Sequence, residues 1–162
     1  MGMAICMVEL TSIARGIETS DDMIKAAQVT LLRGTTVCPG KYMVIVGGET
    51  GAVRAALEAG LAKGGEFIVD SLLIPNVHEQ LFPAIAGTQE VVDPQAIGVV
   101  EFYSIASAIK AADAVGGKGF FIITCDVCDF RSAVAAAEKQ SELYIGSTVI
   151  PRPSKQVLES LL

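Results

Sequence analysis

Charge is scarce in this sequence, and basic charge most of all. Of its 162 residues 19% are charged, and 12 Lys and Arg stand against 18 Asp and Glu, which gives a net charge of −6. The basic residues are scattered, so no patch could neutralise a phosphate backbone, which excludes the nucleic-acid-binding classes. Hydrophobic residues make up 51% of the chain and its mean hydropathy is +0.52. We therefore expect copies of the chain to cover apolar area on one another.

Several other features are absent from the sequence. No uninterrupted apolar run is long enough to span a bilayer, and the first residues lack the basic start and cleavage site of a secretory signal. The four cysteines are irregularly spaced and do not suggest a disulfide framework, so we expect a reducing, cytoplasmic setting with Cys6 in the core. Neither of the glycine-rich phosphate-binding motifs occurs, so the pairs Gly47-Gly48 and Gly64-Gly65 are not interpreted as nucleotide sites.

The chain contains a tandem repeat. When it is shifted by 92 positions, residues 4–21 align with residues 96–113, and nine of the eighteen positions are identical, where chance gives about one. A second shift, of 77 positions, aligns the later parts of the two copies, so the second copy is fifteen residues shorter, with the loss between Ala114 and Gly116. This predicts that the second copy lacks the second strand and its turn. Either those residues were lost or the sequence omits them, and we favour omission because the chain before Ala114 resembles a helix cut short.

The repeat unit consists of alternating strands and helices. Patterning and capping signals predict strands at 4–10, 29–37, 41–48 and 67–74, a turn at 38–40, and helices at 17–28, 52–63 and 78–85. Thr19 or Ser20 is the expected N-cap of the first helix, because two aspartates follow. The polar stretch 87–95 is a predicted linker between a first domain, 1–86, and a second domain, 96–162. The order predicts an α/β fold of the α+β sandwich type, with a small, mostly antiparallel sheet in each domain that helices cover on one face.

These segments resemble a known family. MVELTSIARGIETSDDMIKAAQV, GETGAVRAALEAG and the closing IPNVH and IPRP, in this order and nearly twice over, are similar to the bacterial microcompartment shell domain. The resemblance implies a non-permuted tandem shell protein without catalytic activity, three copies of which form a six-sided tile of a cytoplasmic protein compartment. The partners that it implies are other shell proteins and enclosed redox enzymes, with no nucleic acid and no membrane. It also assigns Lys25 and Arg152 to the edges of the tile.

Within that family the chain is similar to tandem shell proteins of propanediol-utilisation compartments, whose pore cysteine holds an iron–sulfur cluster. TTVCPGK matches their pore segment, which makes Val37, Cys38, Pro39, Gly40 and Lys41 the expected pore-lining residues and Cys38 the expected metal ligand. One thiolate cannot hold such a cluster, but a three-fold axis would bring three Cys38 thiolates together and leave one iron for an outside ligand. The resemblance thus implies a 4Fe–4S cluster shared by three chains, which moves electrons across the shell or is delivered to enclosed enzymes.

Other interpretations stay open for several residues. Cys125 and Cys128 form a C-x-x-C motif after a predicted strand, which is where thiol–disulfide redox motifs lie, and a soluble oxidoreductase is therefore a second hypothesis. The same tile with an empty pore that passes small metabolites is a third. His78, the only histidine, has no evident catalytic partner and is interpreted as a surface residue at a helix start. Glu9 and Glu101 recur at the same strand position, which favours a structural role, such as a hydrogen bond across subunits, over acid–base chemistry.

Overall fold

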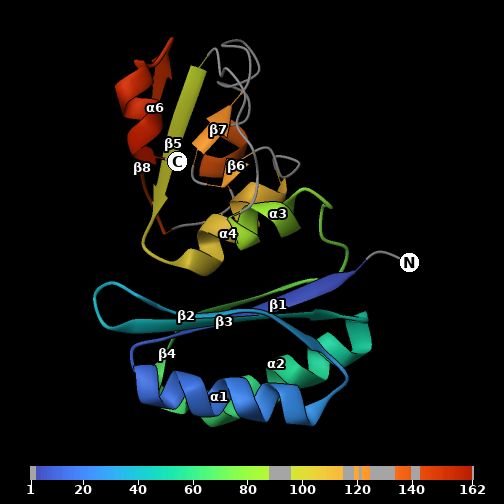
Figure 1. Ribbon diagram of the computed structural model, residues 1–162. Helices are drawn as coiled ribbons and strands as arrows, with labels where there is room; N and C mark the ends of the chain where they lie inside the picture. The colour runs from blue at the N-terminus through green and yellow to red at the C-terminus, as the bar shows by residue number, and fades with distance from the viewer. Residues whose placement is uncertain are drawn as a thin grey trace. The chain divides into compact units, whose positions relative to one another are not determined.

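The computed structural model describes residues 3–87, 96–114, 119–120, 122–124, 134–139 and 143–161. The chain forms two compact units (Figure 1). The first comprises Met1–Val77 together with the short segment Ser104–Ala106, and the second comprises His78–Tyr103 and Ser107–Leu162.

The first unit is a four-stranded antiparallel sheet with two helices on one face (Figure 1). Its elements are β1 Ala4–Leu10, α1 Ile13–Ala26, β2 Thr30–Val37, β3 Lys41–Gly48, α2 Thr50–Gly64, the 3-10 turn η1 Gly65–Phe67 and β4 Ile68–Ile74. The strand order is β2-β3-β1-β4, so β1 is a central strand that pairs antiparallel with both β3 and β4. The predicted sheet covered by helices is confirmed for this unit.

Strand β1 is buried on both of its faces. Every residue from Ala4 to Leu10 is buried, as expected for a short apolar strand at the centre of a sheet. Its even-numbered residues belong to the core under the helices, which consists of Ala4, Cys6, Val8, Leu10, Met23, Val44, Val46, Val53 and Ala56. Each large aliphatic side chain in this core contributes about 1.5–3 kcal/mol through the hydrophobic effect.

Helix α1 begins earlier than the sequence indicated. Ser12 is the N-cap, with an extended backbone at φ −126°, and its side-chain oxygen accepts a hydrogen bond from the Arg15 N–H at 3.3 Å. The predicted caps, Thr19 and Ser20, lie inside the helix, where the Ser20 hydroxyl donates to the Gly16 carbonyl at 2.9 Å. The prediction was wrong because Asp21 and its neighbour were interpreted as a first helical turn, although Ser12 lies only two residues after the end of β1.

Small residues bring α1 and α2 close together. A Cβ atom added to Gly60 of α2 would lie 2.8 Å from the Met23 sulfur of α1. Helix α2 spans two residues more at its start and one more at its end than predicted, and it ends where Gly65 adopts a left-handed φ of +54°.

The second unit repeats this architecture. Its elements are α3 Leu81–Ala86, β5 Ala96–Phe102, α4 Ile105–Ala114, β6 Gly119–Phe120, β7 Ile122–Thr124, β8 Tyr144–Pro151 and α6 Lys155–Leu161, and residues 134–138 are also helical. The sheet order β6-β7-β5-β8 places β5 in the position of β1 and β6, of two residues, in the position of β2. The predicted short helix at 78–85 is α3, which begins later, at Leu81.

The same backbone hydrogen bond follows the central strand in both units. In the first unit the Thr11 N–H donates to the Phe67 carbonyl at 2.8 Å, directly after β1. In the second unit the Tyr103 N–H donates to the Leu143 carbonyl at the same distance, directly after β5. The duplication read from the sequence is therefore a duplication of structure. The domain limits at 86 and 96 and the loss between Ala114 and Gly116 stay predictions.

Candidate functional site

The predicted pore segment is a hairpin turn. Val37 ends β2, Cys38–Gly40 form the turn, and Lys41 begins β3, as the sequence indicated. The Cys38–Pro39 peptide bond is cis. Gly40 has a φ of +75° and no atom within 4 Å of the position a Cβ would take, so the turn requires glycine for its backbone conformation and not for space.

Cys38 is an exposed, free thiol at the end of this hairpin. Among the described residues, no three His, Cys, Asp or Glu side chains gather closely enough to hold a metal ion. The described part of one chain thus offers one thiol at the turn, whereas an iron–sulfur cluster takes about four ligands. The donor set therefore fits a cluster only where several copies of Cys38 meet.

The ammonium group of Lys41 is paired with a buried carboxylate. Lys41 Nζ lies 2.9 Å from Glu9 Oε1, and the Glu9 side chain is 1% exposed, whereas that of Lys41 is 25% exposed. The strand register explains the contact, because Glu9 faces Met43 across the β1–β3 pair and Lys41 begins the same strand. A carboxylate buried this deeply requires both a positive charge and hydrogen-bond donors.

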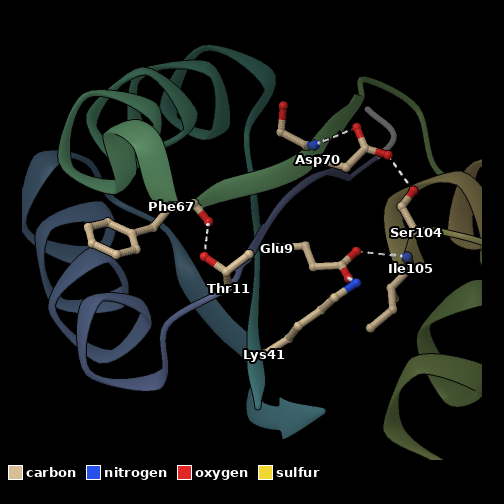
Figure 2. A network of polar contacts seen from close by, with 8 residues as sticks. Glu9, Thr11, Lys41, Phe67, Asp70, Ser104 and Ile105 are labelled. Atoms are coloured by element: carbon tan, nitrogen blue, oxygen red, sulfur yellow. Dashed lines mark hydrogen bonds and ion pairs between the residues drawn. The ribbon is translucent and has the colours of Figure 1, made fainter. Parts of the chain in front are cut away.

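The second oxygen of Glu9 has a hydrogen-bond donor of its own. Glu9 Oε2 accepts a hydrogen bond from the backbone N–H of Ile105 at 2.8 Å, as Figure 2 shows. Ile105 is the first residue of α4, and the first N–H groups of a helix have no partner within it. The negative charge also lies at the positive end of the helix dipole. Glu9 therefore acts as a cap for a helix 96 residues further along the chain.

A second carboxylate contacts the same turn (Figure 2). Asp70 faces Glu9 across the β1–β4 pair, and its Oδ1 accepts from the Ser71 N–H at 2.8 Å. Its Oδ2 accepts a hydrogen bond from the Ser104 hydroxyl. We call Glu9, Lys41, Asp70, Ser104 and Ile105 the Glu9 network. Sequence reasoning found the recurring glutamate but missed Asp70, which has no counterpart in the second copy, and Ser104, although the repeat aligns it with Ser12.

The two predicted tile-edge residues are both on the surface. Lys25, in the last turn of α1, forms an ion pair with Asp21, and this hydrogen bond and the charge of Asp21 raise the pKa of Lys25. Arg152, directly after β8, is exposed and has a φ of +49°, a left-handed conformation that costs about 1–2 kcal/mol outside glycine.

Of the remaining candidate residues, His78 and Cys6 lie in the described part of the chain, and neither has the surroundings of a catalytic group. His78 is exposed, three residues before α3, and its N–H donates to Asp113 Oδ1 at 2.8 Å, which confirms the surface interpretation. Cys6 is fully buried, and burial raises the pKa of its thiol to about 12. Cys125 and Cys128 lie outside the described residues, so the C-x-x-C hypothesis is untested. No helix in the described ranges is long and apolar enough to cross a membrane.

Comparison with known proteins identifies the family. The profile of the BMC domain matches residues 4–77. The chain is 38% identical to the bacterial microcompartment shell protein PduT of Citrobacter freundii over 182 aligned positions, which cover 100% of this chain and 99% of that protein. The chain is a bacterial microcompartment shell protein. Because the alignment is longer than the 162 residues of this chain, PduT contains residues that have no counterpart here.

Further relatives agree with this assignment. The crystal structure of a microcompartments protein from Desulfitobacterium hafniense DCB covers 98% of this chain and 99% of its own, with a TM-score of 0.86 and 35% identity. The carboxysome shell protein CsoS1 of Prochlorococcus marinus is 39% identical over 88 residues, which are 52% of this chain and 85% of that protein. The tandem, mostly antiparallel α/β fold predicted from the sequence is confirmed, as is the membership of a family of compartment shells.

Proposed function

We propose that this protein is a facet component of a bacterial microcompartment shell, in which three copies close into a ring of six similar modules. The observation that carries the proposal is the structural duplication, in which both units have a four-stranded sheet with the same strand order. A chain with two equivalent modules and a surface poor in charge associates with itself more readily than a monomeric enzyme does.

The proposed role is structural rather than catalytic. Glu9, the most deeply buried carboxylate among the described residues, has one oxygen bonded to Lys41 and the other to the N-terminus of a helix. His78 accepts a hydrogen bond at Nδ1 from the Gln80 N–H of its own turn. These contacts stabilise the fold, which is the expected use of polar groups in a tile.

The trimer can be tested by light scattering of the purified full chain. We expect a mass three times that of the 16.9 kDa chain, and flat hexagonal arrays by negative-stain electron microscopy at high protein concentration. A single-chain mass throughout the micromolar range would contradict the proposal.

Within this tile we propose that Cys38, flanked by Val37, Pro39, Gly40 and Lys41, lines the central pore. Three Cys38 thiolates from three chains would hold a 4Fe–4S cluster and leave one iron for an outside ligand. Its support is the exposed, free thiol at the end of the β2–β3 hairpin. When bound, such a cluster carries single electrons, which here would cross the shell or reach enclosed redox enzymes. The chain itself supplies the thiolates and the hairpin turn that carries them.

The cluster is tested by iron and sulfide analysis of protein prepared or reconstituted without oxygen. We expect about four irons per three chains, and their loss in Cys38→Ser. Cys6→Ala is the matched control, because its thiol is buried and its replacement should leave the iron content unchanged. Iron-free protein after reconstitution would favour the same tile with an empty pore for small metabolites.

We propose that Lys25 and Arg152 form lateral contacts between tiles and to other shell proteins. The support for this is that both side chains lie on the surface, and that Arg152 has a left-handed backbone, which is found most often at functional positions when the residue is not glycine. Lys25→Ala and Arg152→Gly should leave the trimer intact and abolish extended arrays under the electron microscope. Arrays that persist in the double variant would overturn the assignment.

A further inference from the structure

The Glu9 network joins positions from different repeats. Glu9 belongs to the first copy of the repeat, whereas Ile105 belongs to the second, although the segment Ser104–Ala106 is part of the first structural unit. The displacement of 92 positions that relates the copies places Glu101 at the position of Glu9 and Ile13 at the position of Ile105. The contact between Glu9 and Ile105 therefore has a potential counterpart between Glu101 and Ile13.

In the part of the chain that the structure describes, neither Glu101 nor the Ile13 N–H takes part in such a contact. Glu101, near the end of β5, is exposed, whereas Glu9, near the end of β1, is 1% exposed. Ile13 is the first residue of α1, as Ile105 is the first residue of α4. Within the described ranges, neither the Glu101 carboxylate nor the Ile13 N–H has a hydrogen-bond partner.

The surface around Ile13 shows the same difference between the copies. Ile17 on α1 is 57% exposed, whereas its repeat partner Ile109 on α4 is 2% exposed. Likewise Ala14 is exposed and its partner Ala106 is buried. The first turns of α1 thus present an apolar face, of Ile13, Ala14 and Ile17, where the equivalent face of α4 is covered.

We propose that a second copy of this chain covers that face, and that its Glu101 accepts a hydrogen bond from the backbone N–H of Ile13. This contact places a negative charge at the positive end of α1, as Glu9 does for α4. It joins the second repeat of one chain to the first repeat of the next, which is a head-to-tail contact of the kind that closes into rings. The inference rests on the proposed association of copies but names the residues that make it.

The junction between chains differs from the Glu9 network in one respect. Asp70 faces Glu9 across β1 and β4, but Gly146 faces Glu101 across β5 and β8. Because glycine has no side chain, the bond that the Ser104 hydroxyl donates to Asp70 has no counterpart at Gly146. The Glu9 network thus has two carboxylates, Glu9 and Asp70, whereas the proposed junction between chains has only Glu101. Loss of Glu101 should therefore weaken that junction strongly.

The test measures association of the full chain by sedimentation velocity over a range of concentrations. We expect Glu101→Ala to weaken the association by roughly 10- to 100-fold per junction, the usual effect of losing a hydrogen bond to a charged group. Glu101→Gln, which keeps an oxygen acceptor without the charge, should lie between it and the wild type. Glu58→Ala removes an exposed glutamate from α2 and is the matched control, with wild-type association expected.

A second readout locates the bond. Hydrogen exchange of the peptide that contains Ile13 should be slow in the assembled wild type and in Glu58→Ala, and fast in Glu101→Ala at a concentration where that variant still associates. Circular dichroism establishes that each variant is folded. If Glu101→Ala associates and exchanges like a wild-type protein that forms trimers, this proposal is overturned while the tile stands. A wild type that stays monomeric would overturn the tile as well.

Discussion

Cys6 and Glu9 lie three residues apart on opposite faces of β1, and their side chains have opposite electrostatic environments. The Cys6 thiol is buried among apolar side chains and is stable there only when it is neutral. Glu9, on the other face of the strand, is surrounded by donors and a lysine that suit a charged group. Alternation along one strand thus places a neutral and a charged environment a few ångströms apart.

The raised pKa of Cys6 makes the fold sensitive to alkali. The folded pKa is about 12 against about 9 in the unfolded chain, so the folded state keeps a proton that the unfolded state loses. This stabilisation is complete below about pH 9 and is lost as pH rises from about 9 toward 12, by up to about 1.4 kcal/mol per pH unit. We expect urea unfolding to show a steeper loss of stability between pH 8.5 and 10.5 in the wild type than in Cys6→Ala. Equal slopes would contradict this.

Removal of the Glu9 carboxylate should destabilise the fold strongly. Glu9→Ala leaves Lys41 without its ion pair and the Ile105 N–H without an acceptor, and we expect a loss of about 3 kcal/mol in the free energy of unfolding. Glu9→Gln, which keeps an acceptor for the N–H, should lose less. Chemical denaturation measures both, with Glu58→Ala as the exposed control, and a Glu9→Ala protein as stable as that control would refute the assigned role.

At the scale of elements, the way α1 begins decides how much of its first turn can contact another chain. Because the cap is Ser12, the helix begins at Ile13 and not at the predicted Ile17, so it gains about one turn at its start. The added turn carries Ile13 and Ala14, which are exposed and continue the face of the exposed Ile17. A helix that began at Ile17 would have left Ile13 and Ala14 outside the helix.

The cap assignment is tested by two serine substitutions in the same helix. Ser12→Ala removes the acceptor for the Arg15 N–H and should cost about 1 kcal/mol. Ser20→Ala removes a hydroxyl whose acceptor, the Gly16 carbonyl, also has a helical N–H, so a cost below about 0.5 kcal/mol is expected. Thermal or urea unfolding of the two variants compares them directly, and the reverse order would restore the cap predicted from the sequence.

Contacts between residues close in the sequence could be predicted, whereas contacts between distant residues could not. The β2–β3 turn was predicted correctly because Pro39 and Gly40 determine it within three residues. The burial of β1 and the packing of α1 on α2 follow from local composition. By contrast, Glu9 and Ile105 are 96 residues apart, and the Ser104 bond to Asp70 spans 34. The repeat pointed to the glutamate, but only the fold identifies what it binds.

At the scale of the whole molecule, the two copies of the module have the same strand order but differ at their ends. The first copy carries Asp70 and the second has Gly146 at the same register. The copies thus share a fold without sharing every contact. The two copies therefore need not make the same contacts at this register.

Association should make the apparent stability depend on protein concentration. Because only folded chains associate, mass action stabilises the folded state as concentration rises. For a trimer of chains of this length, we expect the unfolding temperature to rise by roughly 2–4 °C per tenfold increase in concentration. Differential scanning calorimetry at three concentrations measures this rise. Glu101→Ala should show it only at higher concentrations, and a wild type whose unfolding temperature is constant would argue against association.

The fusion of two modules in one polypeptide also restricts the number of modules in a closed ring. Any closed ring built from complete chains contains an even number of modules, since each chain contributes its pair. Six is therefore accessible and five is not. In the proposed facet ring, the covalent pairing of the two modules would therefore allow three chains and exclude any ring of five modules.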